Sequence, residues 1–263
     1  MDLHLTDRVA LVCGSSSGLG LAIAETLAGE GCRVALNGRD AARLERAVQR
    51  IGRSAPSQVA GFAADVSVPD QAVRLVTDVE VRFGRLDILV ANAGGPPAGR
   101  ATELADADWQ RALDLNLLST VTLCRAAVPG MRARSWGRVL CLTSVAAKQP
   151  LGDLVLSTTA RAGVLGFAKC LADEVAADGV TVNVLCPGYM QTQRSGDLME
   201  RRARETGETT EAVTERLTAA IPARRMGAPA ELAAVVAFLA SEGAAYVTGT
   251  AVQVDGGLIR SIT

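Results

Sequence analysis

The chain has 263 residues, of which 49% are hydrophobic and only 3% aromatic, so we expect one large core built from Ala, Val, Leu and Ile. Its 27 basic and 28 acidic residues give a net charge of −1 with no basic stripe, which gives no reason to expect a nucleic-acid partner. No apolar run approaches the roughly 18 residues that a membrane helix needs, and the charged N-terminus does not resemble a signal peptide. We therefore expect a cytoplasmic protein with no membrane partner.

The six cysteines occur singly, and no pair has the CxxC or CxxH spacing of a zinc site. Cys13, Cys141 and Cys186 fall in or beside apolar, strand-like runs. Buried free thiols in a reducing compartment are therefore expected, and no metal site.

Short apolar runs alternate with longer amphipathic segments. The short runs predict strands at residues 8–13, 33–37, 59–64, 86–91, 138–143, 180–186 and 251–254. The longer segments predict helices at residues 18–29, 41–51, 70–83, 106–131, 157–177 and 230–240, and Pro69 and Pro229 stand where two of these would start. Such alternation predicts one α/β domain over residues 1–263, with a doubly wound, Rossmann-type sheet of seven parallel strands flanked by helices.

Residues 189–225 break this rhythm because they are long, charged and without a strand pattern. They leave the sheet after the sixth strand, at the edge where such sheets bind ligands. A plain surface insertion and a substrate lid both fit the pattern, and we expect a lid.

A glycine-rich loop, CGSSSGLG at residues 13–20, joins the first strand to the first helix. Glycines there permit a tight turn and a close approach of the backbone to a pyrophosphate, and the helix N-terminus offers free N–H groups to the phosphates. The loop therefore predicts a dinucleotide site. Its candidate residues are Gly14, Ser16, Ser17, Gly18, Leu19 and Gly20.

The GxxxGxG spacing of this loop, with the motifs that follow it in order, resembles the short-chain dehydrogenase/reductase family, and most closely its 3-oxoacyl carrier-protein reductases. Three further matches imply cofactor contacts: an adenine-binding Asp65-Val66, the Asn92-Ala93-Gly94 motif beside the cofactor, and Pro187-Gly188 with Thr192 at the nicotinamide amide. The sequence VDGG at 254–257 matches the family's C-terminal motif. The resemblance also implies that Asn116 anchors a proton-relay water and that Ser144 hydrogen-bonds the substrate oxygen.

The chain departs from the family pattern at the catalytic centre. The family places Tyr thirteen residues after its Ser and Lys four further on, and here these positions hold Ser157 and Arg161. Lys normally lowers the Tyr pKa from about 10 so that the phenol can transfer a proton. Ser has no comparable acidity and Arg stays protonated, so we expect Arg161 to contact the nicotinamide ribose or an anion and Ser157 to be at best a hydrogen-bond donor or water anchor. A second departure, Cys13 in place of the usual Thr, changes little.

Two other residues could take over part of the role of the family's Tyr and Lys. Lys148 lies four residues after Ser144, where it is either solvated or able to stabilise an oxyanion. Tyr189 follows Pro-Gly, where packing is the expected role.

The end of the second strand predicts the cofactor. Enzymes that use NAD commonly carry an acidic residue there for the ribose 2′-hydroxyl, and this chain reads Asn37-Gly38-Arg39. The Arg39 guanidinium can pair with a 2′-phosphate, so NADP(H) is favoured over NAD(H). A surface arginine with no ligand is the alternative.

Two functions from different classes remain open. The first is a reductase of a small-molecule carbonyl or alcohol substrate with an altered proton donor, and the second is a nucleotide-binding regulatory or scaffold protein without turnover. We favour the enzyme because Ser144, Asn116 and Thr192 are all present. The resemblance also implies a homo-tetramer that pairs the 106–131 and 157–177 helices between subunits.

Overall fold

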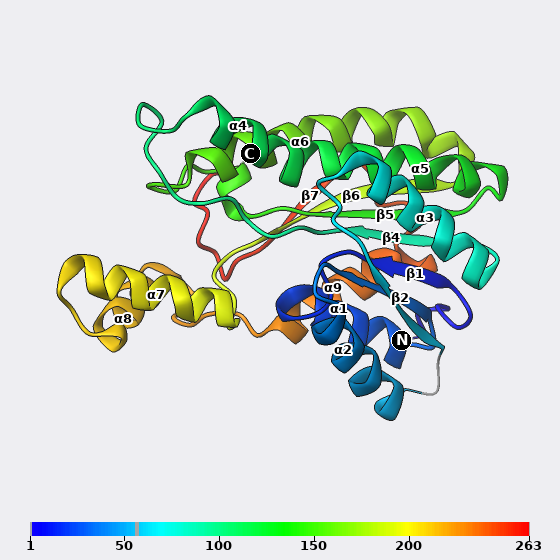
Figure 1. Ribbon diagram of the computed structural model, residues 1–263, viewed down its shortest axis with the longest axis horizontal. Coiled ribbons are helices and arrows are strands. Elements are labelled where there is room, and N and C mark those ends of the chain that lie inside the picture. The colour runs from blue at the N-terminus through cyan, green and yellow to red at the C-terminus, as the bar shows by residue number, and fades with distance from the viewer. Residues whose placement is uncertain (1, 56–57, 263) are drawn as a thin grey trace.

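Seven parallel strands form one sheet in the order β3-β2-β1-β4-β5-β6-β7 in a computed structural model that describes residues 2–55 and 58–262 (Figure 1). The strands are β1 (Val9–Val12), β2 (Arg33–Gly38), β3 (Val59–Ala63), β4 (Ile88–Ala91), β5 (Gly137–Leu142), β6 (Val180–Pro187) and β7 (Ala251–Val254). The predicted doubly wound parallel sheet is confirmed. The order reverses at β1, which pairs with β2 on one side and β4 on the other. A crevice at the carboxyl ends of β1 and β4 is therefore the expected ligand site.

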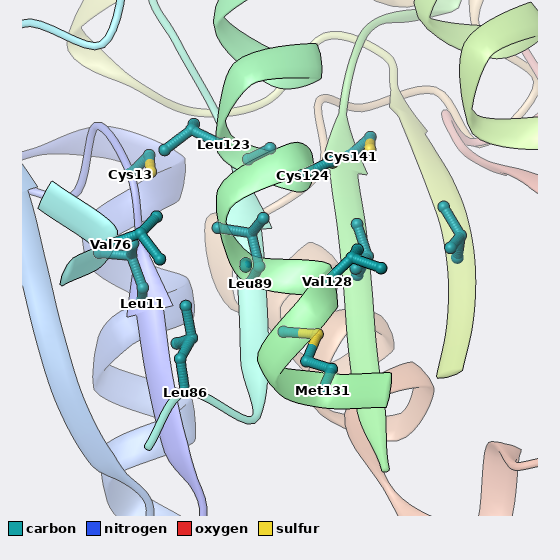
Figure 2. Close-up of a cluster of buried hydrophobic side chains, with 14 of the residues drawn as sticks. Leu11, Cys13, Val76, Leu86, Leu89, Leu123, Cys124, Val128, Met131 and Cys141 are labelled. Carbon is teal, nitrogen blue, oxygen red and sulfur yellow. The ribbon is translucent and has the colours of Figure 1, made fainter. Parts of the chain in front are cut away.

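Helices cover both faces of the sheet (Figure 1). One face carries α3 (Pro69–Phe83), α4 (Asp106–Leu113), α5 (Ser119–Ala133) and α6 (Val155–Val175), and the other carries α1 (Gly18–Gly29), α2 (Ala41–Ser54) and α9 (Pro229–Ala240). Figure 2 shows the first of these interfaces, where Leu123 and Val128 of α5 pack towards Leu89 of β4. Because both faces are covered, β1, β4 and β5 are buried along their whole length, which explains their uninterrupted apolar sequences.

The 189–225 segment contains two helices, α7 (Gln193–Thr206) and α8 (Thr210–Ala220), which project from the body of the molecule (Figure 1). They pack on each other through a small cluster of their own, formed by Met199, Ala203 and Val213. This segment therefore has little apolar attachment to the main core.

The helix predicted over residues 106–131 is confirmed in its extent, because the backbone stays helical from Asp106 to Ala133. It is not α-helical throughout, since a π-helical turn, Asp114–Leu118, lies between α4 and α5. In that turn the Asn116 side-chain amide donates to the Gly94 carbonyl oxygen at 2.7 Å, which ties the helix to the loop after β4. This contact accompanies the irregular turn, and hydrophobic periodicity alone does not reveal it.

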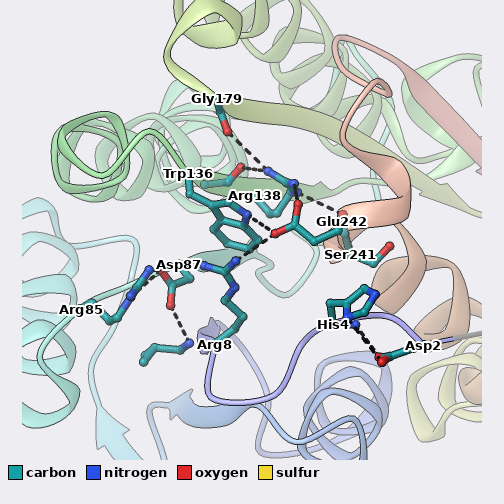
Figure 3. A network of polar contacts seen from close by, with 12 residues as sticks. Asp2, His4, Arg8, Arg85, Asp87, Trp136, Arg138, Gly179, Ser241 and Glu242 are labelled. Atoms are coloured by element: carbon teal, nitrogen blue, oxygen red, sulfur yellow. Dashed lines mark hydrogen bonds and ion pairs between the residues drawn. The ribbon is translucent and has the colours of Figure 1, made fainter.

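A polar network secures the amino-terminal edge of the sheet (Figure 3). Arg138 of β5 is 2% exposed, and its guanidinium donates to the Ser241 carbonyl at 3.3 Å and lies 3.6 Å from the Glu242 carboxylate. The Trp136 indole donates to the same carboxylate at 2.7 Å. A buried guanidinium is tolerated here because carbonyls, a carboxylate and the indole face surround it.

All six cysteines are free, and all but Cys170 are buried, so the prediction of buried free thiols is confirmed for Cys13, Cys141 and Cys186. Burial raises the pKa of the Cys13 thiol to about 12. Within residues 2–55 and 58–262, no helix has the length and apolar character to cross a membrane.

Candidate active site

The glycine-rich loop turns tightly between β1 and α1. Gly14 and Gly18 both have φ of +59°, a conformation that favours glycine. A Cβ on Gly14 would lie 2.8 Å from Asn92 Nδ2, and a Cβ on Gly20 would overlap the Gly14 carbonyl. Asn92 in turn donates to the Cys13 carbonyl at 3.0 Å, which couples this loop to the end of β4.

The N-terminus of α1 is open for an anion. Ser17, the residue before the helix, makes no side-chain cap, and the first turn carries no acidic residue. The free N–H groups and positive potential of a helix N-terminus fit a pyrophosphate. The loop and helix therefore fit the dinucleotide that the sequence predicts.

A pocket of about 680 Å³ opens at the carboxyl ends of the strands. It brings together segments far apart in the chain: the glycine loop, the loop after β4, the end of β5, the start of α6, and the β6–α7 connection. Fourteen of the residues expected to bind cofactor or substrate line it: Gly14, Ser17, Gly18, Leu19, Gly20, Asn92, Ala93, Gly94, Ser144, Ser157, Arg161, Pro187, Gly188 and Thr192.

Thr192 begins α7 opposite the glycine loop. Its hydroxyl accepts from the Ser195 backbone N–H at 3.3 Å, and a Cβ on Gly18 would lie 4.0 Å from its methyl group. Helix α7 therefore starts at the mouth of the candidate dinucleotide site.

Ser157 and Arg161 form one buried unit inside the pocket. Their exposed fractions are 8% and 7%, and Arg161 Nε donates to Ser157 Oγ at 3.1 Å. A second guanidinium N–H donates to the Leu142 carbonyl at 3.2 Å. Burial, and then the nearby charge of Arg194, lowers the pKa of Arg161 to about 10, so it stays protonated at neutral pH. Because Ser157 Oγ accepts from a cation, its own O–H is left to donate.

Ser144 follows β5 and caps a short 3₁₀ turn, where its hydroxyl accepts from the Ala146 N–H at 3.1 Å. Asn116 is buried beside the pocket without lining it, and its Oδ1 has no partner within the described residues. Lys148 lies outside the lining, whereas Tyr189 lines the pocket and also packs against the cluster of α7 and α8.

Four residues expected to bind the cofactor do not line the large pocket. Ser16 packs against Gly38, and Val66 is buried in the core. Arg39 is 75% exposed, and its guanidinium lies 3.6 Å from the Asp65 carboxylate. Arg39 and Asp65 therefore meet at the carboxyl ends of β2 and β3, beside the glycine loop.

Asp65 is charged at neutral pH. Its partial burial opposes ionisation, but hydrogen bonds from the Ser67 hydroxyl and N–H, together with Arg39, hold the pKa of the Asp65 carboxyl below its usual range. The pair thus combines an anion held by hydrogen bonds with an exposed cation.

Sequence reasoning missed three arginines of α7 that line the pocket: Arg194, Arg201 and Arg204. Their positions are seven and three residues apart, which places them on one side of a helix. That spacing is visible in the sequence, but the sequence does not show that this side of the helix faces the pocket.

Comparison with known proteins agrees with this geometry. Residues 14–259 match a family model described as enoyl-(acyl carrier protein) reductase. The chain is 37% identical over 255 residues to nodulation protein G of Rhizobium sp. (strain N33), covering 97% of this chain and 98% of that protein. It is 34% identical over 256 residues to the 3-oxoacyl-[acyl-carrier-protein] reductase of Escherichia coli (strain K12), covering 97% and 99%.

Among solved structures, L-sorbose reductase from Gluconobacter frateurii, complexed with NADPH and L-sorbose, superposes with a TM-score of 0.96. The two chains are 35% identical, and the match covers 100% of each. With the glycine loop, the strand order and these matches in agreement, the chain belongs to the short-chain dehydrogenase/reductase family of oxidoreductases and resembles its 3-oxoacyl carrier-protein reductases.

Proposed function

We propose that this protein is an NADP(H)-dependent reductase of a small carbonyl compound, in which Ser157 and Arg161 occupy the positions of the family's Tyr and Lys. One observation carries the proposal: a single pocket joins the glycine loop, Ser144 and the Ser157–Arg161 unit. The reductases and the NADPH complex among the relatives support the direction and the cofactor.

The residues would divide the work as follows. The glycine loop and the start of α1 would hold the pyrophosphate, and Pro187-Gly188 with Thr192 would hold the nicotinamide amide. Arg39 would pair with the 2′-phosphate. A reduced nicotinamide supplies the hydride, which is added to the carbonyl carbon while the cofactor is oxidised.

The carbonyl oxygen gains negative charge as the carbon is reduced, and it must take a proton. Ser144 and the free O–H of Ser157 would donate hydrogen bonds to this oxygen, and Arg161 would stabilise the charge through Ser157 and the local field. Ser157 is too weak an acid to be the source of the proton, so water would be the ultimate donor. The buried Asn116 Oδ1 offers an acceptor that can hold such a water.

The test is an assay of NADPH oxidation with a panel of ketones, aldehydes and oxo esters, beside NADPH binding measured by calorimetry. We expect turnover with at least one carbonyl compound, and Ser144→Ala should lower kcat by about 10²-fold, as for loss of an oxyanion-stabilising donor. NADPH binding without turnover across the panel would favour the alternative, a nucleotide-binding regulatory or scaffold protein.

A further inference from the structure

The pocket carries a marked excess of positive charge. Among the described residues that line it, the charged ones are Arg161, Arg194, Arg201, Arg204 and a single acid, Asp197. The Nε atom of Arg201 lies 3.5 Å from the Glu205 carboxylate of its own helix, but this buried atom makes no hydrogen bond. The protein's own carboxylates therefore leave most of this charge unpaired.

Arg161 is the most buried of these cations. Within the described residues its hydrogen-bond partners are a hydroxyl and a backbone carbonyl, and no carboxylate lies within ion-pair distance. Arg194 is close enough for its charge to lower the pKa of Arg161, and it has no ion pair with a described residue either. Arg194 is the exposed member of the two and Arg161 the buried one. A buried guanidinium without a counter-ion is unfavourable, and an anionic ligand that Arg194 also contacts would relieve this cost.

The loop after β4 makes room for Arg194. The guanidinium of Arg194 lies against Gly95, and a Cβ at Gly95 would overlap both of its terminal nitrogens and its central carbon. Gly95 follows the Asn92-Ala93-Gly94 motif, and Pro96 and Pro97 beside it also line the pocket. The absence of a side chain at Gly95 thus leaves room for Arg194 in the wall of the pocket.

We infer that Arg161 and Arg194 form an oxyanion-binding subsite, so that the substrate is a small carbonyl or alcohol compound carrying a carboxylate or a phosphate. The planar forks of two guanidinium groups match the paired oxygens of either anion. This inference rests on the proposed function, because it assigns the substrate of the same pocket.

The cofactor's own phosphates are the competing anions. The open N-terminus of α1 already supplies donors for the pyrophosphate, and Arg39 lies at the other end of the dinucleotide site. Arg194 lies instead against the loop after β4 in a pocket that Leu151, Leu154 and Ser157 also line. The reacting end of a substrate would lie in this same pocket, beside Ser144 and Ser157.

The experiment compares anions with their neutral counterparts on the protein saturated with NADP⁺, where no reduction occurs. The probes are pyruvate, acetoacetate and levulinate, each beside its methyl ester, and dihydroxyacetone phosphate beside dihydroxyacetone. Binding is measured by calorimetry for the wild type, for Arg194→Gln, and for Arg202→Gln, which removes the same charge from α7 outside the pocket lining. NADPH affinity is measured for all three proteins.

At least one anion should bind about ten- to hundredfold more tightly than its neutral counterpart, as expected for charge-assisted hydrogen bonds. Arg194→Gln should abolish this preference and leave NADPH affinity unchanged, while Arg202→Gln should alter neither. A preference among oxo acids identifies a carboxylate, and one for the phosphate identifies a phosphorylated substrate.

Equal binding of anions and neutral compounds, or no binding of any probe, would overturn the inference. So would a loss of NADPH affinity in Arg194→Gln with no change for the anions, which would assign the arginines to the cofactor. The same probes are then assayed with NADPH. Anions that bind but are not reduced would count against the proposed reductase activity alone. Reduction of the neutral compounds, without any preference for anions in binding, would count against the subsite alone.

Discussion

Arg161 Nε donates to Ser157 Oγ at 3.1 Å, so the two side chains, one helical turn apart on α6, form a fixed donor pair. The arrangement keeps a positive charge next to a hydroxyl that cannot itself titrate in the physiological range. The consequences of this pair for proton transfer can be measured.

The first consequence is a flat pH profile. Ser157 does not titrate, and Arg161, whose lowered pKa is about 10, remains charged below that value. We expect kcat/KM for carbonyl reduction to be level from about pH 6 to about pH 9 and to fall only as Arg161 begins to lose its proton. A profile with an apparent pKa between these limits would reveal a titrating catalytic group other than Ser157 and Arg161.

Restoring the family's pair should raise activity. In Ser157→Tyr with Arg161→Lys, a phenol beside an ammonium replaces a weak donor beside a guanidinium. A matched general acid contributes about 10²–10⁴-fold in rate, so kcat for a ketone should increase, by up to this factor. Single-turnover kinetics with each single variant as a control separate the pair from its parts. Rapid reduction by the native protein that survives Ser157→Ala would show that the Ser157 hydroxyl does not stabilise the substrate oxygen, with Lys148 the next candidate for that role.

The Arg39–Asp65 pair should set the choice of cofactor. We expect Arg39→Ala to raise the Kd for NADPH by about tenfold, because a charge-assisted contact to the 2′-phosphate is lost, and to leave NADH unchanged. Arg53→Ala, at the far end of the exposed face of α2, is the control. Equal affinity for both cofactors, insensitive to Arg39, would contradict a preference for NADP(H).

The α7–α8 segment should become ordered when ligand binds. Its own small cluster gives it little anchorage to the sheet, so its amides should exchange faster than those of β4 and β5 in the free protein. Addition of NADPH should slow exchange at the start of α7, where Thr192 faces the glycine loop. Protection in the free protein equal to that of β4 and β5 would exclude a lid.

The protein should assemble as a homo-tetramer through α5 and α6. Leu118 at the start of α5 is 44% exposed and Phe167 of α6 is only partly buried, so these helices retain apolar surface for a partner. Multi-angle light scattering at micromolar concentration measures the mass, and Cys170, exposed on α6, reports protection from thiol reagents. A stable species of 27.2 kDa would disprove the assembly.

Much of the fold could be predicted because it depends on local pattern. Runs such as VALV in β1 are apolar throughout, since both faces of each central strand are covered, and the alternation with helices then determines the parallel topology. The glycine loop could be predicted because its steric requirement is local. Where the observed end of a helix or strand differs from the predicted one, the difference is one to three residues. Element ends depend on capping contacts that the hydrophobic pattern does not contain.

The arginine cluster could not be predicted in the same way. Arg194 lines the same pocket as Arg161 only because β6 leads into α7 beside that pocket, and that path depends on tertiary packing. The pairing of Arg39 with Asp65 likewise joins the ends of two strands whose distance is set by the sheet. In both cases the residue type indicates an anion-binding role, but the sequence does not show which other residue lies beside it.

The π-helical turn at Asp114–Leu118 acts as a one-residue spacer. A π turn carries one residue more than an α turn, so deletion of a single residue there can restore a regular helix without displacing α4 or α5 from the sheet. The same deletion would rotate Asn116 away from the Gly94 carbonyl and disconnect the helix from the loop after β4. In this chain, the contact between Asn116 and the loop after β4 thus depends on a single residue of chain length, and its loss would leave the packing of α4 and α5 intact.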